Sequence, residues 1–214
     1  MRIGVLSVQG AFVEHLAMLD SMAVDPVAVR LPEDLAGLSG LILPGGESTT
    51  IRKLIDRWGL RDPILDLAAQ GAPILGTCAG MILLAARISD GDDPVFPLLD
   101  ITVKRNAFGR QLESFEADVS VPLLGDMPVH GVFIRAPIVE HVGADVDVLA
   151  RLDDGRVVAV RQQNVLATAF HPELAAEPRF HRLLVTMAGA HDEPGEGSGR
   201  RPHPTRRSGQ RGGR

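Results

Sequence analysis

Short, continuous apolar runs alternate with amphipathic segments through residues 2–88, and this alternation constrains the fold more than any other feature of the sequence. Runs such as RIGVLSV and APILGT are too short for buried helices and are typical of strands buried on both faces. The segments between them are typical of helices, and in residues 10–22 we expect one apolar stripe made of Phe12, Val13, Leu16 and Leu19. The pattern predicts strands at 2–8, 26–30, 40–46 and 72–77, and helices at 10–22, 49–57, 61–70 and 79–88. Buried strands separated by helices indicate a parallel sheet in a three-layer α/β/α domain.

The second half of the chain changes character and is rich in strand signals. The sequence DDG at 153–155 is typical of a hairpin turn. We expect strands at 100–106, 117–121, 130–134, 146–152, 156–162 and 165–170, followed by a last helix at 177–189. No linker composition separates the two halves, so these strands are interpreted as an antiparallel extension of the first sheet. The fold class is therefore α/β, with a mixed and largely parallel central sheet.

The last segment of the chain differs in composition from everything before it. Residues 191–214 contain no aliphatic residue and carry six Arg against three acidic residues. Such a segment buries too little apolar surface to offset its ordering entropy, so we expect a disordered tail. The domain prediction is a single domain over 1–190 and a tail over 191–214. The tail's local positive charge is compatible with weak RNA contact, but a solvated extension is the favoured interpretation.

The composition argues against several classes of function and location. The formal net charge of −5 gives no overall electrostatic reason for a nucleic-acid or membrane-surface partner. A single cysteine can form neither an internal disulfide nor a multi-thiolate metal site, which fits a reducing compartment. The amino-terminal segment is interrupted by polar residues where a signal peptide would be apolar, and no apolar run approaches the ~20 residues that span a bilayer. We therefore expect a cytoplasmic protein.

The single cysteine, Cys78, lies in the sequence GTCAG at the junction of a predicted strand and a predicted helix. Gly76 and Gly80 flank it symmetrically, as in the tight nucleophile elbow where larger neighbours would collide. The start of the following helix favours a thiolate, because the helix dipole is positive there. Free cysteine is also common as a small buried hydrophobic residue, and this alternative stands beside the catalytic one. The glycines favour a nucleophile.

A candidate base follows the last predicted strand, in the sequence AFHPEL. Pro172 favours an extended conformation at His171, and residues two apart in an extended chain face the same side. Glu173 is therefore expected to orient the imidazole of His171, as a carboxylate does in nucleophile–histidine–acid triads. A solvated surface histidine and half of a metal site are the competing interpretations. The metal alternative lacks further ligands at suitable spacing, so no metal is predicted.

The sequence LPGGESTT at 43–50 supplies a third candidate element. Two glycines between a strand and a helix allow backbone N–H groups to point outward and stabilise an oxyanion, which assigns Gly45 and Gly46 to that role. The alternative is a simple turn in which Ser48 or Thr49 caps the next helix. Both interpretations can hold together.

GTCAG, FHPE and PGG resemble motifs of the class I glutamine amidotransferases. Longer stretches extend the resemblance over residues 2–188 and are similar to the glutaminase subunits of pyridoxal 5′-phosphate synthases: SVQGAFVEH, LPGGESTTIRKL, RNAFGRQLESFEAD and GVFIRAP. The resemblance implies a flavodoxin-like α/β/α fold and a Cys-His-Glu triad formed by Cys78, His171 and Glu173. The Arg-rich tail is the one departure from the family pattern, and it carries none of these residues.

The resemblance also implies that glutamine is held by six positions, namely Gly46, Glu47, Ser48, Arg105, Ile134 and Arg135. Physical chemistry agrees for Arg105, because a guanidinium is a natural partner for the carboxylate of a free amino acid. A solvated surface charge is the alternative for Arg105, and Arg110 is a weaker candidate of the same kind. Gln9 follows the first strand, where ligands of α/β sheets usually lie, and is expected at the pocket mouth or on a partner face.

In the implied reaction, glutamine is hydrolysed to glutamate and ammonia through a thioester. Ammonia released at neutral pH would mostly become ammonium, so the resemblance implies direct delivery to a barrel-shaped synthase subunit that makes pyridoxal 5′-phosphate. No cofactor is expected on this chain. Two other classes remain open at this point: a cysteine amidohydrolase or amidotransferase of another pathway, and a non-catalytic assembly module.

Overall fold

The computed structural model describes residues 1–105 and 114–192, and its centre is a mixed sheet. Five neighbouring strands on one side of this sheet are parallel, in the order β2 (Asp25–Val29), β1 (Arg2–Leu6), β3 (Gly40–Leu43), β4 (Ile74–Thr77) and β12 (Val165–Thr168). All residues of β3, β4 and β12 are buried, as continuous apolar runs predict for strands covered on both faces. The parallel half of the fold is thus confirmed.

The sheet continues beyond β12 with antiparallel strands. The order is β11 (Val157–Gln162), β9 (Ile138–Val142), β6 (Leu99–Lys104) and β5 (Ala85–Ile88), while β10 (Asp147–Arg151) also pairs with β11. Only β5 and β6 pair in parallel here. This half is the antiparallel extension expected from the sequence, except that β12, which was expected to belong to it, pairs with β4 in parallel.

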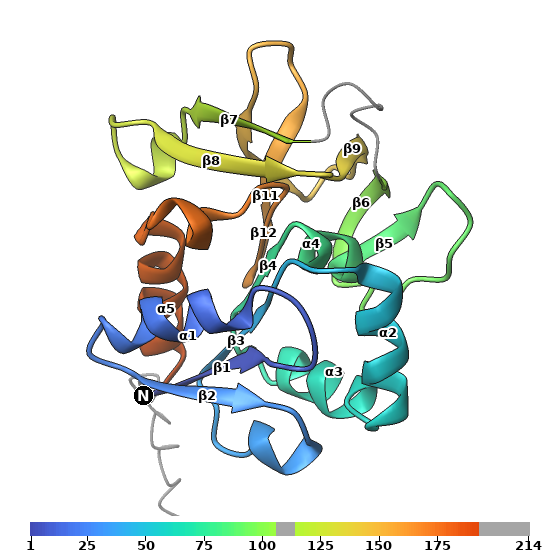
Figure 1. The fold of residues 1–214 in the computed structure, drawn as a ribbon, viewed down its shortest axis with the longest axis vertical. Coiled ribbons are helices and arrows are strands. Elements are labelled where there is room, and N and C mark those ends of the chain that lie inside the picture. Colours follow the sequence, from blue (N-terminus) through green and yellow to red (C-terminus); the bar gives the residue numbers. More distant parts are fainter. Residues whose placement is uncertain (106–113, 193–214) are drawn as a thin grey trace, which may run out of the picture.

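Two strands form a separate sheet. β7 (Ser114–Val119) pairs with β8 (Val129–Ile134) in antiparallel register. Figure 1 shows this hairpin above the carboxyl ends of the parallel strands, beside the short 3₁₀ helix η3 (Pro172–Ala175). A single bridge, in which His171 N–H donates to Val132 O at 2.9 Å, ties the hairpin to the chain that leaves β12. The hairpin therefore closes one side of the edge where a site can form.

Helices cover both faces of the parallel strands (Figure 1). α1 (Phe12–Asp20) and α5 (Arg179–Asp192) lie on one side, and α2 (Ser48–Arg57), α3 (Arg61–Ala69) and α4 (Ala79–Leu84) lie on the other. Two further 3₁₀ helices lie in connections: η1 (Pro32–Leu35) and η2 (Pro122–Leu124). The core is aliphatic, with a short run of phenylalanine contacts linking the hairpin to α5 through Phe133, Phe170 and Phe180.

Several sequence predictions need correction. The helix expected over 79–88 ends at Leu84, because 85–88 pairs with β6 as a strand. The strand β9 was not predicted, and β7–β8 is a separate sheet where the extension of the main sheet was expected. In α1, Val13 is 61% exposed, and His15 takes the buried position beside Leu19.

The last helix is longer than the sequence suggested. It ends at Asp192. His191 Nε2 hydrogen-bonds with Gln70 O, and the Ser39 hydroxyl donates to Asp192 Oδ2. The first two residues of the predicted tail are therefore helical. The rest of that tail, 193–214, and Arg110 lie outside the described residues. Among the residues that are described, no helix is both long and apolar enough to cross a membrane.

Candidate active site

The register of three neighbouring strands brings distant parts of the sequence to one edge of the sheet. β4 lies between β3 and β12, with Leu43 opposite Gly76 and Thr168 opposite Thr77. Because these strands are parallel and neighbouring strands lie about 4.8 Å apart, the segments that follow them leave the sheet side by side. The three segments are the glycine loop after β3, the Cys78 turn after β4 and the His171 turn after β12. Ligands bind at such carboxyl ends in open α/β sheets.

Cys78 occupies a strained backbone conformation between β4 and α4. Its φ of 51° and ψ of −103° lie in a backbone region that residues other than glycine rarely adopt. The chain can turn this sharply because Gly76 and Gly80 carry no side chains. A Cβ at Gly80 would lie 2.0 Å from Leu43 O, and a Cβ at Gly76 would lie 2.6 Å from the Gly80 backbone. The turn is held by Cys78 N–H donating to Thr168 O at 2.8 Å. The side chain is 6% exposed, with Sγ 3.7 Å from Ile134 O.

His171 and Glu173 form a buried pair next to this sulfur. Nδ1 of His171 lies 2.7 Å from Oε1 of Glu173, and the ring also interacts with Cys78. The two side chains meet because the 3₁₀ helix η3 begins at Pro172 and turns the chain. The extended conformation that was expected to place them on one side is not what brings them together. The arrangement joins a thiol, an imidazole and a carboxylate in series.

The charges of this pair support each other. Burial opposes protonation of the ring, but the hydrogen bonds with Cys78 and then Glu173 raise the pKa of His171 to about 10. Burial also opposes ionisation of Glu173, but hydrogen bonds from His15 and His171 lower its pKa to about 2. The site is therefore built to hold an imidazolium over a carboxylate.

A second pair of imidazoles continues the series into the core. His15 Nε2 lies 3.4 Å from Glu173 Oε1 and 3.2 Å from Thr77 Oγ1. His15 Nδ1 lies 2.8 Å from Nε2 of His181, and both histidines are fully buried. Burial lowers the pKa of His181 to about 3. This ring is therefore neutral at any ordinary pH.

The glycine loop after β3 is held by side chains and backbone of its neighbours. Gly45 N–H donates to Thr77 Oγ1 at 3.1 Å, and Gly45 O accepts from Ala11 N–H at 2.9 Å. Glu47 N–H donates to Gln9 Oε1 at 2.9 Å, which places Gln9 beneath the loop. A Cβ at Gly45 would lie 2.1 Å from Cε1 of His171. The loop thus passes directly over the imidazole and tolerates no side chain there.

The cap of α2 differs from the sequence expectation. Both carboxylate oxygens of Glu47 accept backbone hydrogen bonds, from Thr49 N–H at 3.1 Å and Thr50 N–H at 2.7 Å. Glu47 is therefore the N-cap, and the expectation that Ser48 or Thr49 would cap this helix is wrong. The hydrogen bond from the Thr50 hydroxyl, stronger than the opposing effect of burial, lowers the pKa of Glu47.

An open pocket of about 780 Å³ gathers most of the residues singled out in the sequence. Those that line it are Gly45, Gly46, Glu47, Ser48, Cys78, Arg105, Ile134, Arg135 and His171. Glu173 does not line the pocket and lies beneath His171, while Gln9 supports the loop from behind. The pocket thus has a buried end at Cys78 and a charged, more open end at Arg105.

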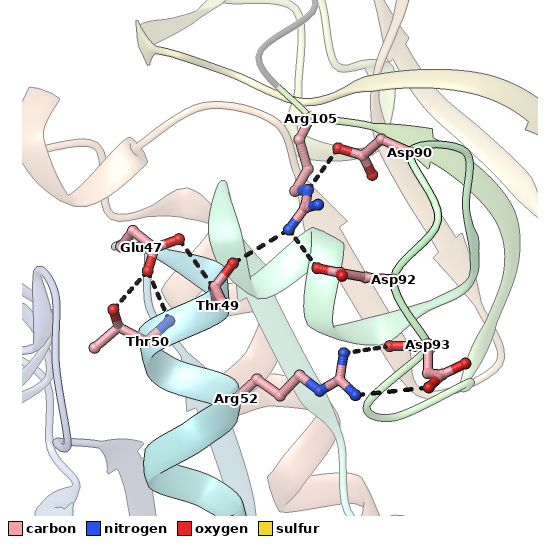
Figure 2. Close-up of polar contacts among 8 residues, drawn as sticks. All are labelled: Glu47, Thr49, Thr50, Arg52, Asp90, Asp92, Asp93 and Arg105. Atoms are coloured by element: carbon pink, nitrogen blue, oxygen red, sulfur yellow. Dashed lines mark hydrogen bonds and ion pairs between the residues drawn. The ribbon is translucent and has the colours of Figure 1, made fainter.

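Arg105 is already paired with acidic side chains (Figure 2). Its Nε lies 2.7 Å from Asp90 Oδ2, and its Nη1 lies 2.6 Å from Asp92 Oδ2 and 3.2 Å from Thr49 Oγ1. Asp90 also lines the pocket. Hydrogen bonding and ion pairing with Asp90 raise the pKa of Arg105, against a smaller effect of burial. The cation stays charged and is oriented along the pocket wall.

Sequence reasoning missed His15, Thr77 and His181. A signal was present, because His15 precedes Leu19 by four residues and His181 precedes Leu184 by three, which puts each imidazole on the apolar stripe of its helix. A polar residue on such a stripe needs a buried partner. The two histidines are each other's partners, 166 residues apart in the chain.

Comparison with known proteins agrees with this architecture. Residues 5–189 match the SNO glutamine amidotransferase family. The chain is 56% identical over 190 residues to the "Pyridoxal 5'-phosphate synthase subunit PdxT" of Herpetosiphon aurantiacus, covering 87% of this chain and 100% of that protein. It is 58% identical over 192 residues to the protein of the same name from Dehalococcoides mccartyi, covering 88% and 97%.

Solved structures agree as well. A crystal structure described as a glutamine amidotransferase superposes with a TM-score of 0.81 at 48% identity, covering 87% of this chain and 98% of that one. The structure of PurLQS from Thermotoga maritima shares the fold alone, with a TM-score of 0.65 at 19% identity, covering 86% and 97%. With the family match covering most of the chain, the protein belongs to the SNO glutamine amidotransferase family.

Proposed function

We propose that this chain is the glutaminase subunit of a pyridoxal 5′-phosphate synthase, with Cys78, His171 and Glu173 as its catalytic triad. The observation that carries the proposal is one pocket in which a strained Cys78 meets His171, with Glu173 buried behind the ring. The names and high identity of the relatives support the assignment to vitamin B6 synthesis. We assign the glutaminase domain to 1–190 together with residues 191 and 192, which complete α5.

The reaction follows from the order of the three side chains. The Cys78 thiolate adds to the side-chain amide carbon of glutamine, and the His171 imidazolium gives its proton to the departing nitrogen. Ammonia leaves, and a γ-glutamyl thioester remains on Cys78. Neutral His171 then takes a proton from water, whose oxygen attacks the thioester and releases glutamate. Glu173 stabilises the imidazolium that is present at the start and re-formed at the end.

Glutamine is held with its side chain toward Cys78 and its charged end toward Arg105. Gly46, Glu47 and Ser48 line one wall of the pocket, and Ile134 and Arg135 line another. The substrate carboxylate exchanges with one of the aspartates that bond to Arg105. Such an exchange is inexpensive because ion pairs that are partly open to solvent contribute little net stability.

The oxyanion is assigned to the amides of the Gly45–Gly46 region, and we propose that the synthase barrel activates them. In the chain alone, Gly45 N–H is bonded to Thr77 and Glu47 N–H to Gln9, so these two amides point to protein acceptors. Binding of the barrel reorders the loop and aims amides at the substrate. Ammonia then passes directly to the synthase, which makes pyridoxal 5′-phosphate as its product. A free thiol at the active centre fits a reducing compartment, so we place the protein in the cytoplasm.

The test measures glutamate and ammonia formation by the full chain, with and without the synthase barrel. We expect slow turnover alone, faster turnover in the complex, and no turnover by the Cys78→Ala complex. Equal rates with and without the barrel would contradict the loop activation. Unchanged product formation by Cys78→Ala would point to a non-catalytic assembly role, and turnover of other amides in place of glutamine would point to a different cysteine hydrolase.

A further inference from the structure

Glu173 is approached by two imidazoles, and only one of them belongs to the triad. His171 contacts Glu173 Oε1 through Nδ1 at 2.7 Å, and His15 faces the same oxygen through Nε2 at 3.4 Å. An ionised carboxylate only accepts hydrogen bonds, so both nitrogens must carry protons. His15 therefore has its proton on Nε2.

The contact with the next ring needs one more proton. His15 Nδ1 and His181 Nε2 lie 2.8 Å apart, so one of these two nitrogens donates and the other accepts. If the proton is on Nε2 of His181, then Nδ1 of His15 is the acceptor. Nδ1 of His181 then carries only a lone pair. That atom has no hydrogen-bond partner within 1–105 and 114–192, which suits a lone pair better than a buried N–H donor. Each proton position along the series is consistent with its neighbours.

The same histidine reaches the glycine loop. His15 Nε2 also lies 3.2 Å from Thr77 Oγ1, which accepts from Gly45 N–H at 3.1 Å. The His15 ring thus contacts both Glu173, which orients the catalytic base, and the Thr77 hydroxyl, which holds the glycine loop. Both helices that supply the pair, α1 and α5, lie on the same side of the sheet (Figure 1).

We propose that His15 and His181 are positioning residues for glutamine hydrolysis: His181 sets the tautomer of His15, and His15 holds Glu173 ionised and aimed at His171. This inference rests on the proposed function. The low pKa of His181 supports it, because a neutral imidazole carries a single N–H and so leaves one ring nitrogen as a lone pair. The other oxygen of Glu173, Oε2, has no hydrogen-bond partner in the described part of the chain, so the two imidazoles are what orients this carboxylate.

The pH readout depends on every titratable group at this point. His171 faces Glu173 from its own segment, His15 faces it from α1, and His181 stands behind His15 on α5. Cys78 faces His171 from the turn before α4. Loss of the His15 donor is expected to raise the pKa of Glu173, because one of the bonds that favours its charged form disappears.

Two substitutions at His15 separate the two nitrogens. His15→Gln keeps a donor near the position of Nε2, whereas His15→Asn keeps a polar group near Nδ1 and leaves Glu173 without its second donor. In the complex with the synthase barrel, we expect kcat for glutamine to fall about 10- to 100-fold in His15→Asn and much less in His15→Gln, with KM unchanged. The acidic limb of the kcat profile should move to higher pH in His15→Asn by about half a unit or more.

The same pair of substitutions is made at His181, with His191 on the same helix as the matched control. His181→Gln keeps the donor to His15 and should retain most activity, while His181→Asn should lose activity as His15→Asn does. His191→Asn and His191→Gln should leave kcat and its pH profile unchanged, since that ring contacts Gln70 O away from the pocket.

The proposal is overturned if His15→Asn keeps the wild-type kcat and pH profile. It is equally overturned if both His15 variants lose activity only in proportion to a lowered melting temperature, with an unmoved pH profile. Nitrogen-15 NMR of the unmodified chain adds a test that needs no variant: His181 should be neutral at pH 6 with its proton on Nε2, and any other state contradicts the proposal. Glutaminase activity in Cys78→Ala would instead refute the proposed function itself.

Discussion

The two ends of the pocket are built differently. At one end, His171 and Glu173 are at most 6% exposed and meet at 2.7 Å, with further imidazoles behind them. At the other end, Arg105 is paired with Asp90 and Asp92, whose side chains are more than a third exposed. At the buried end, water cannot take the place of a lost hydrogen-bond partner, whereas at the Arg105 end it can.

This difference suggests a division of work between rate and affinity. Buried charges that lose a partner remain unpaired, so changes at the buried end should act on the chemical step. Ion pairs near solvent can be exchanged, so changes at the open end should act on substrate binding. Substitutions at each end can therefore break or sharpen this division.

Substitution of the catalytic base should produce the largest effect. His171→Gln removes the proton donor and acceptor of both chemical steps, so kcat for glutamine in the complex should fall about 10³-fold, with little change in KM. Rates of glutamate release measure this directly. His141→Gln, an exposed position on β9, serves as the matched control and should behave as the unmodified chain. A loss expressed mainly in KM would break the proposed division.

A methyl group added over the imidazole should have the next largest effect. The Cβ of Gly45→Ala would overlap Cε1 of His171, so either the loop or the ring must move. Misplacement of this size should lower kcat about 10²-fold. Gly189→Ala on α5 is the control, because its Cβ meets nothing closer than 3.5 Å, and it should retain full activity. Steady-state kinetics of both variants decide whether the ring needs this close cover.

The charged pair at the buried end should also make stability depend on pH. Since the folded pKa of His171 is raised to about 10 from 6.5, its contribution is complete below about pH 6.5 and is lost as pH rises toward 10. Glu173, with its pKa lowered to about 2, contributes fully above about pH 4.5 and loses this only in strong acid.

The free energy of unfolding should therefore fall by about 2 kcal/mol more in the unmodified chain than in His171→Gln between pH 7 and 9. Denaturant unfolding at several pH values provides the measurement. Parallel curves for the two proteins would show that the imidazolium is not stabilised in the folded chain.

The smallest effect is expected at the open end. Arg105→Ala should raise KM for glutamine about tenfold and leave kcat within about twofold, because a partly solvated charge pair is lost. Arg52→Ala is the matched control, since Arg52 pairs with Asp93 on the same loop but does not line the pocket (Figure 2). A large fall in kcat for Arg105→Ala would show that the two ends are not separable.

Local sequence patterns predicted the parts of the site that depend on local geometry. The small residues around Cys78 indicated a sharp turn, and the continuous apolar runs indicated that β3 and β4 are buried parallel strands. Pro172 marks the start of the turn after β12, but the strand ends at Thr168 instead of 170, and the turn is a 3₁₀ helix and not an extended chain. These features are set by neighbours a few residues away.

Features that depend on distant partners were not predicted. Residues 85–88 continue an apolar run, and only their pairing with β6 makes them a strand. His15 and His181 meet only after α1 and α5 have packed on the same face of the sheet. Glu47 replaces Ser48 as the helix cap because both of its oxygens reach backbone N–H groups. The spacing of apolar residues along the sequence does not predict such long-range contacts.

The buried series joins the first helix of the described chain directly to the last one through His15 and His181, and His15 connects both to Glu173. During synthesis, α1 emerges from the ribosome long before α5, so a nascent chain holds His15 without the ring that sets its tautomer. Full glutaminase competence should therefore arrive only when translation has passed α5.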